Sequence, residues 1–147
     1  PDVIVSPLGS GLLLTSLEKG HRELSELGEA PEVPPRLVGS QPAGCAPIVR
    51  GFESADGRPK PVRKPDTIAE SLAIGDPGSG FEAVQSIRET HGFADAPTDP
   101  EILEGVRLLA RNGLKTPAVW GNAFPPLAPI PATLAAVDGF LGGRARG

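Results

Sequence analysis

The stretch that most constrains the fold is Asp2–Leu27, because three structural signals follow one another in it. Val3–Val5 is a short β-branched apolar run, typical of a buried strand. Ser6–Gly11 then interrupts the run with proline and glycine. The helical pattern that follows places apolar residues and one glycine on a single helix face, at steps of four and three residues: Leu13, Leu17, Gly20, Leu24 and Leu27. The order of strand, glycine loop and helix indicates an α/β fold.

A glycine loop in this position can bind an anion. Gly9 and Gly11 can adopt backbone angles closed to other residues and let a ligand approach the main chain. Free N–H groups of the first helical turn, at the positive end of the helix dipole, favour a phosphate, and Ser10 adds a hydroxyl donor. A plain tight turn is the competing interpretation. The loop matches neither G-x-G-x-x-G nor a P-loop, so we expect a phosphate other than that of ATP or NAD.

A second strand signal, Arg36–Gln41, follows the first helix after a short loop. Strand, helix and strand with short connections form a βαβ unit, which implies a parallel sheet and a right-handed crossover. We therefore expect Val3–Pro7 and Arg36–Gln41 to be adjacent parallel strands. The helix from about Leu12 to Leu27 should cross one face of that sheet.

Further elements alternate along the rest of the chain. The pattern predicts a helix over Ala43–Glu53, a proline-rich loop over Ser54–Asp66 and a second helix over Phe81–Thr90 that packs Phe81, Val84 and Ile87. A brief strand is expected at Phe93–Ala96. Thr67–Ile74 is ambiguous between helix and strand.

The last predicted helix has a clear start. Thr98 and Glu101 fit a capping box, and Pro100 suits the first turn. Its expected buried side is made of Ile102, Leu103, Val106, Leu109 and Ala110, and Asn112-Gly113 should end it. The following Leu114–Pro131 contains too many prolines for a regular helix or central strand. We therefore divide the chain into a domain at residues 1–114 and a Pro/Gly-rich tail at 115–147.

Composition excludes several classes of function. The net charge of −4 provides no basic surface for nucleic acid. No apolar run approaches the roughly 20 residues of a membrane span. The single cysteine, Cys45, can form neither an internal disulfide nor a cysteine metal site, and its apolar neighbours indicate a core residue. Two separate histidines do not suggest a metal, so we expect none. These features favour a cytoplasmic protein, and the start at Pro1, almost inside a strand, favours a fragment of a larger one.

Four blocks of sequence carry a specific resemblance. They are PDVIVSPLGSGLLLTSLEKGHREL, PRLVGSQPAGCAPIVRGFE, KPDTIAESLAIGDP and DPEILEGVRLLARNGL. Together, and in this order over roughly the first 114 residues, they resemble threonine synthases, which are fold-type-II enzymes that use pyridoxal 5′-phosphate. The resemblance implies the tryptophan-synthase-β-like fold: a three-layer α/β arrangement with a parallel sheet and flanking helices.

The resemblance also assigns residues. It places the loop residues Gly9, Ser10, Gly11 and Leu12 at the cofactor phosphate. The substrate pocket near the reactive edge of the cofactor corresponds to Thr67, Ile68, Ala69 and Glu70, although a surface carboxylate is the competing interpretation of Glu70. Thr133 is the counterpart of a hydroxyl that reaches the pyridine nitrogen, with a helix N-cap as the competing interpretation.

No lysine has the family's catalytic setting. A Schiff-base lysine needs a sheltered pocket that lowers its pKa. Lys19 lies on the polar side of the first predicted helix. The candidates Lys60 and Lys64 lie in the proline-rich loop, and Lys115 lies at the start of the tail. The expected setting lies upstream of Pro1, so the Schiff-base lysine is not in this chain and the isolated chain should be inactive.

The resemblance implies a function for the parent protein. That parent would convert O-phosphohomoserine and water to threonine and phosphate, as a small-molecule enzyme without nucleic-acid or membrane partners. Two alternatives stay open: a threonine or serine dehydratase, and a non-catalytic remnant that binds phosphate without turnover. A homodimer also stays open for the full-length parent. If the loop holds phosphate, Gly11→Asp should weaken cofactor binding more than it weakens folding.

Overall fold

Three parallel strands form the sheet of the computed structural model, which describes residues 1–111, with side chains described to residue 108. The strands are β1 (Val3–Pro7), β2 (Arg36–Ser40) and β3 (Phe93–Asp95), and they lie in the order β1-β2-β3. Both pairs are parallel, with Val5 opposite Val38 and Val38 opposite Phe93. The predicted parallel pairing of the first two strands is confirmed.

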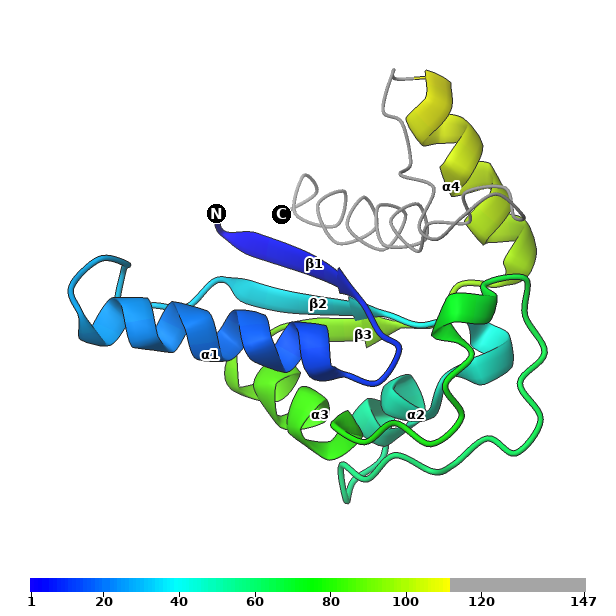
Figure 1. The fold of residues 1–147 in the computed structure, drawn as a ribbon, viewed down its shortest axis with the longest axis horizontal. Helices are drawn as coiled ribbons and strands as arrows, with labels where there is room; N and C mark the ends of the chain where they lie inside the picture. Colours follow the sequence, from blue (N-terminus) through cyan, green and yellow to red (C-terminus); the bar gives the residue numbers. More distant parts are fainter. Residues whose placement is uncertain (112–147) are drawn as a thin grey trace, which may run out of the picture.

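Helices connect the strands in the expected βαβ manner (Figure 1). The helix α1 (Leu12–Glu26) joins β1 to β2, while α2 (Pro47–Glu53) and α3 (Gly80–Glu89) lie between β2 and β3. The helix α4 (Asp99–Arg111) starts beside the carboxyl ends of the strands. The predicted class, a parallel α/β sheet with flanking helices, is confirmed.

One apolar core joins the sheet to the helices. It contains residues from the loop after β1, from α1, β2, α2 and α3, and from the turn before α2: Leu8, Leu14, Leu37, Ala46, Ile48, Val49, Ala83, Val84 and Ile87. Ile4 and Ala94 from the flanking strands pack against this cluster. Because Leu37 is in register with Ile4, these side chains mark the sheet face that the helices cover.

The rotation of α1 differs from what its leucine pattern suggests. Its buried residue is Leu14, which belongs to the core. The predicted apolar face is turned outward instead: Leu13, Leu24 and Leu27 are 53%, 49% and 75% exposed. The start of α1 is held against the turn before α3 by a main-chain hydrogen bond from Ser79 N–H to the Ser10 carbonyl (3.0 Å), and this attachment decides which side of the helix turns inward.

Smaller differences also have local causes. The predicted helix over Ala43–Glu53 is divided into a 3-10 turn, η1 (Ala43–Cys45), and α2, because Pro47 has no N–H and is tolerated at a helix start. Phe81 was expected to pack inward, but it is 41% exposed, with the Arg58 guanidinium 5.2 Å from its ring centroid. Leu103 on α4 is likewise 40% exposed, whereas Ile102 is buried.

The predicted helix start at Thr98 is confirmed. Both the backbone N–H and the hydroxyl of Thr98 donate to Glu101 Oε2, at 2.8 and 2.7 Å. These bonds lower the pKa of the Glu101 carboxyl, because they stabilise its charged form. Among residues 1–111, no helix has both the length and the apolar character needed to cross a membrane.

Candidate functional site

The glycine loop lies where ligands of parallel sheets bind. It leaves the carboxyl end of β1, and the Leu8 N–H donates to the Ser40 carbonyl at the end of β2 (2.8 Å). In open α/β sheets, ligands occupy the crevice outside the carboxyl ends of the strands. Gly11 is the N-cap of α1, in the left-handed conformation with φ 91°. The loop therefore aims the start of a helix at the ligand edge of the sheet.

The backbone amides of this loop are available to an anion. Among the described residues, the N–H groups from Gly9 to Leu14 donate to no main-chain acceptor, and the first helical bond runs from Thr15 N to the Gly11 carbonyl (3.2 Å). The Leu12 N–H has only a long contact, 3.4 Å, with Ser10 Oγ. Unpaired donors at the positive end of a helix fit the charge and the acceptors of a phosphate.

Gly11 has a packing role that the sequence did not reveal. A Cβ at this position would lie 2.6 Å from the Ser79 carbonyl oxygen and 3.1 Å from Ala83 Cβ. The missing side chain thus makes room for the turn before α3. The expectation that Gly11→Asp would weaken cofactor binding more than folding left this contact out: the added Cβ meets the protein itself, so the fold should be damaged as well.

The second set of predicted residues, Thr67–Glu70, is fixed by an aspartate from α4. The Thr67 hydroxyl donates to Asp99 Oδ1 (2.7 Å), and the Ile68 N–H donates to Asp99 Oδ2 (3.1 Å). Ala69 is buried against Ile102 of α4. Glu70 is exposed and begins a 3-10 turn, η2 (Glu70–Leu72).

The structure brings this segment next to the glycine loop. A Cβ built on Gly9 would lie 3.1 Å from Ile74 Cδ1 and 3.7 Å from Leu72 Cδ2. The residues that directly follow Thr67–Glu70 therefore pack against the loop. The two candidate sets, far apart in sequence, belong to one region at the carboxyl ends of the strands.

Gln41 is a buried polar residue in this region that the sequence reasoning missed. Its backbone N–H donates to the Asp95 carbonyl at the end of β3 (3.1 Å). Its side-chain Oε1 accepts hydrogen bonds from Ile48 N (2.9 Å) and Val49 N (3.4 Å) at the start of α2. Gln41 thereby joins a strand end to a helix start. A polar residue directly after a buried strand was the signal that could have identified it.

The remaining candidates divide into exposed, buried and undescribed residues. Lys60 and Lys64 are exposed, and Lys19 forms a surface ion pair with Glu23, so none of these lysines lies in a sheltered pocket. Cys45 is buried, which confirms the prediction of a core residue, and burial raises the pKa of its thiol. Thr133 and Lys115 lie outside the described residues.

Comparison with known proteins identifies the family. The family model described as pyridoxal-phosphate dependent enzyme matches residues 1–116. This chain belongs to that family. Its cofactor class is therefore pyridoxal 5′-phosphate, as the four-block resemblance implied.

Curated relatives are threonine synthases. The protein from Methanosarcina acetivorans is 38% identical over 111 residues, which cover 76% of this chain and 27% of the relative. The protein from Methanocaldococcus jannaschii is 35% identical over 112 residues, with the same two shares. The protein from Mycobacterium tuberculosis strain H37Rv is 38% identical over 111 residues, covering 76% of this chain and 28% of the relative. The chain thus spans little more than a quarter of their length.

Solved structures support the fold. A threonine deaminase from T.th. matches with a TM-score of 0.64 and 20% identity, over 95% of this chain and 44% of that one. Maize serine racemase matches with a TM-score of 0.57 and 17% identity, over 74% and 30% of the two chains. These likenesses bear on the fold alone, and they confirm the predicted fold-type-II architecture.

Proposed function

We propose that this chain provides the cofactor-phosphate site of a threonine synthase, which converts O-phosphohomoserine and water to threonine and phosphate. The observation that carries the proposal is the run of amides from Gly9 to Leu14 without main-chain partners, at the helix start on the ligand edge of the sheet. Relatives called threonine synthase, at 38% and 35% identity, support the choice of reaction.

The residues of this chain bind and position, and the cofactor does the bond chemistry. When bound, pyridoxal 5′-phosphate supplies an electron sink for carbanion chemistry. The amides of Gly9, Ser10, Gly11 and Leu12 hold its phosphate, assisted by the dipole of α1. Thr67–Glu70 line the substrate pocket, where Asp99 fixes the Thr67 side chain and the Ile68 backbone. Thr133 remains our candidate for the hydroxyl that reaches the pyridine nitrogen.

The isolated chain should bind the cofactor phosphate without turnover, because no lysine within residues 1–111 lies in a sheltered setting. We assign residues 1–114 to the partial catalytic domain and residues 115–147 to a tail.

The matched ligands pyridoxine 5′-phosphate and pyridoxine isolate the contribution of the phosphate to binding, since neither has an aldehyde that could react with surface lysines. Titration calorimetry should show binding of the phosphorylated ligand and much weaker binding of the other.

Leu12 offers a sharper variant than Gly11. Its side chain is 60% exposed at the first helical position, so Leu12→Asp removes no core contact, and its charge favours the helix start by about 0.3–1 kcal/mol. The same charge repels a phosphate dianion by about 4 kcal/mol per charge pair at roughly 4 Å and an effective dielectric near 20, before solvation reduces it. Leu12→Asp should therefore weaken pyridoxine 5′-phosphate binding at least about tenfold, and the neutral control Leu12→Asn should not.

Two experiments test the proposal, one for the phosphate role and one for the reaction. Equal affinity of the folded Leu12→Asp and Leu12→Asn variants would remove the phosphate role from this loop. For the reaction, a longer polypeptide that contains this chain and a Schiff-base lysine should release phosphate and threonine from O-phosphohomoserine. Formation of 2-oxobutanoate from threonine instead would favour the dehydratase alternative, and absence of both activities in a cofactor-loaded protein would favour the non-catalytic remnant.

A further inference from the structure

Gln41 carries a buried side-chain donor that has no partner. The residue is 1% exposed, and its Oε1 accepts the N–H groups of Ile48 and Val49 at the start of α2. Among the described residues, its Nε2 has no hydrogen-bond partner. The two donors at Oε1 fix which end of the amide is the oxygen, so the unpaired group is the NH₂. Because an unpaired buried donor is costly, this group indicates a partner that the described chain does not supply.

The Gln41 side chain leaves the sheet on the face and at the edge where the glycine loop begins. A Cβ on Gly39 would lie 2.5 Å from Leu8 Cδ1 and 3.1 Å from Ile87 Cδ1, so Gly39 faces the helices and Leu8 covers it. Gln41 continues the strand ladder, because its N–H donates to the Asp95 carbonyl (3.1 Å). Side chains alternate along extended backbone, so Gln41 is on the same face as Gly39. The glycine loop follows directly from Leu8 and therefore starts beside Gln41.

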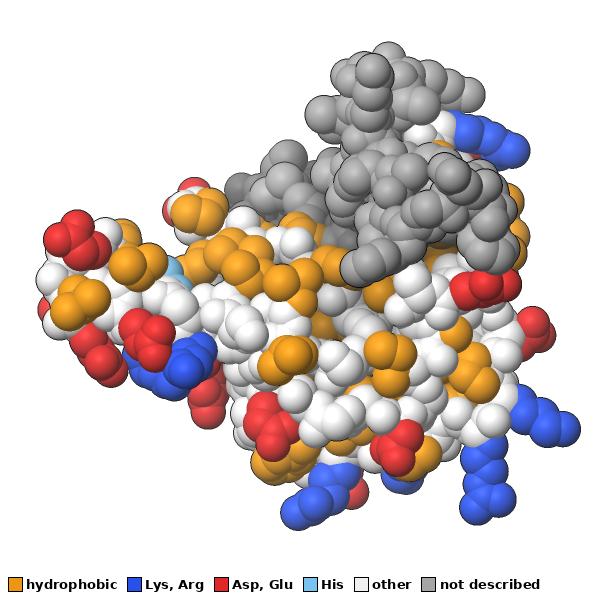
Figure 2. Space-filling view, in the orientation of Figure 1, with side chains coloured by type: hydrophobic (Ala, Val, Ile, Leu, Met, Phe, Trp, Pro, Cys, Tyr) orange, Lys and Arg blue, Asp and Glu red, His pale blue; other side chains and the backbone are white. Residues whose placement is uncertain are grey.

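The donors that the glycine loop offers to an anion are neutral. Lys19 is the first residue in the chain with a positively charged side chain, so the loop itself provides backbone amides and the Ser10 hydroxyl. In Figure 2, the visible Lys and Arg side chains lie away from the place where β1 turns into α1. The three terminal oxygens of a phosphate accept several hydrogen bonds. A neutral carboxamide NH₂ is therefore the kind of donor that would complete this set.

We propose that Gln41 is a further phosphate-binding residue, whose Nε2 donates to the cofactor phosphate beside the amides of the glycine loop. The inference rests on the proposed phosphate site and adds to it a side chain from the end of β2. Gln41 then makes two kinds of contact at once, since Oε1 holds the start of α2 and Nε2 holds the anion. A buried water is the alternative partner of Nε2, because such waters satisfy buried polar groups in many proteins.

Isotope labelling of the glutamine side chains tests the contact in the unmodified chain. The sequence has two glutamines, Gln41 and Gln85, so a sample labelled only at glutamine nitrogen gives two side-chain NH₂ signals in NMR spectra. Pyridoxine 5′-phosphate should shift the Gln41 signal and slow its hydrogen exchange, whereas pyridoxine should do neither. The signal of Gln85, which is on α3, is the internal reference and should stay unchanged. A Gln41 signal that does not respond to saturating pyridoxine 5′-phosphate would identify water as the partner and overturn the proposal.

Two substitutions separate the donor of Gln41 from its acceptor. Gln41→Glu keeps an oxygen for the amides at the start of α2 and removes the NH₂ group, whereas Gln41→Met removes both. Each should weaken the binding of pyridoxine 5′-phosphate at least about tenfold, the usual loss for a hydrogen bond to a charged group. Each should leave the weaker binding of pyridoxine unchanged. Titration calorimetry with the two ligands measures both affinities.

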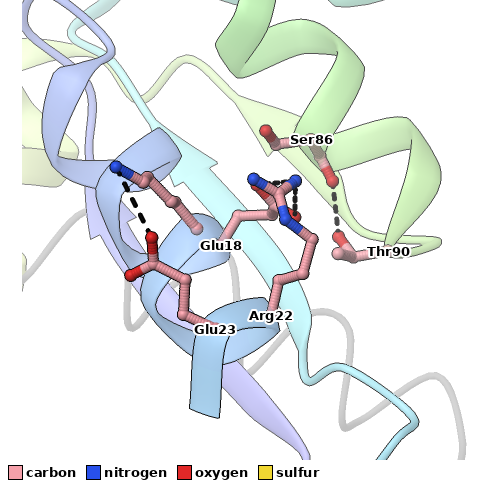
Figure 3. A network of polar contacts seen from close by, with 6 residues as sticks. Glu18, Arg22, Glu23, Ser86 and Thr90 are labelled. Carbon is pink, nitrogen blue, oxygen red and sulfur yellow. Dashed lines mark hydrogen bonds and ion pairs between the residues drawn. The ribbon is translucent and has the colours of Figure 1, made fainter. Parts of the chain in front are cut away.

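Thr90→Val is the matched control for a lost buried polar group. Thr90 is 5% exposed, donates to the Ser86 carbonyl (2.8 Å, Figure 3) and accepts from the Leu37 N–H (3.1 Å) near the amino end of β2. Its loss should lower the free energy of unfolding and leave both ligand affinities unchanged. If the wild type prefers the phosphorylated ligand and both folded Gln41 variants keep that preference, this inference is wrong and the proposed function stands. No preference in the wild type would overturn both, and if circular dichroism shows the variants to be unfolded, the labelled wild-type sample decides.

Discussion

Replacing Gly11 by alanine should be the most damaging of three simple glycine substitutions. Its φ of 91° lies in the left-handed region, which costs an L-residue roughly 1–2 kcal/mol. The new Cβ would also lie 2.6 Å from the Ser79 carbonyl oxygen, and overpacking against backbone typically costs about 1–3 kcal/mol. Alanine recovers about 0.4–1 kcal/mol by restricting the unfolded chain. The net loss in the free energy of unfolding should be about 2–4 kcal/mol.

Two other glycines separate the backbone cost from the steric cost. Gly28, just after the end of α1, has φ 77° and nothing within 4 Å of a built Cβ, so Gly28→Ala should cost only about 0.5–1 kcal/mol. Gly9 is outside the positive-φ region, and its Cβ would meet the flexible end of Ile74 at 3.1 Å. Gly9→Ala should therefore change stability by less than about 0.5 kcal/mol in either direction.

Urea denaturation of the three variants, with common slopes, measures these differences. The order of destabilisation should be Gly11→Ala, then Gly28→Ala, then Gly9→Ala. If Gly11→Ala costs no more than Gly28→Ala, the close packing of the loop on the turn at Ser79 is not real. The explanation given for the rotation of α1, which depends on that packing, would fall with it.

Three further predictions concern single side chains. Asp99→Ala should lower the free energy of unfolding by about 2–4 kcal/mol, because it removes the carboxylate that accepts two hydrogen bonds. It should also speed hydrogen exchange at the Ile68 amide, which donates one of those bonds. Asp99→Asn keeps one acceptor oxygen and should cost less. The Glu101 carboxyl, whose pKa is lowered by folding, stabilises the protein above its unfolded pKa of about 4.3. The stability difference from Glu101→Gln, below about 1 kcal/mol at this exposed site, should therefore vanish as the pH falls through the folded pKa. Cys45 should resist a thiol reagent at pH 8 in the native state and react on unfolding.

The sequence was sufficient where the signal was local or periodic. The parallel pairing of β1 and β2 followed from the strand–helix–strand order, and the start of α4 followed from Thr98 and Glu101, three residues apart. It was insufficient where distant residues decide. The bond from Thr67 to Asp99 spans 32 residues, and no pattern in either segment indicates it.

The rotation of α1 shows the same limit in a more instructive form. Periodicity alone selects the face shared by Leu13, Leu17, Gly20, Leu24 and Leu27 as the one that packs on the sheet. The structure turns Leu14 inward instead, because the loop at Gly11 packs on the turn before α3. A periodic apolar pattern shows that a face avoids water, but it does not say which partner covers it.

The same reasoning changes what the glycine loop proves about function. Gly11 is needed by the fold itself, since a side chain there would strike the Ser79 carbonyl. A glycine at this position is thus no sign of a bound phosphate, and loss of cofactor binding in a Gly11 variant would not distinguish a missing cradle from a damaged fold. Support for the site comes from the amides of Gly9 to Leu14, which have no main-chain partner. Because the Leu12 side chain is exposed at their edge, a charge placed there acts on the anion and leaves the packing intact. The case for a phosphate site therefore depends on comparing Leu12→Asp with Leu12→Asn, and not on the glycines.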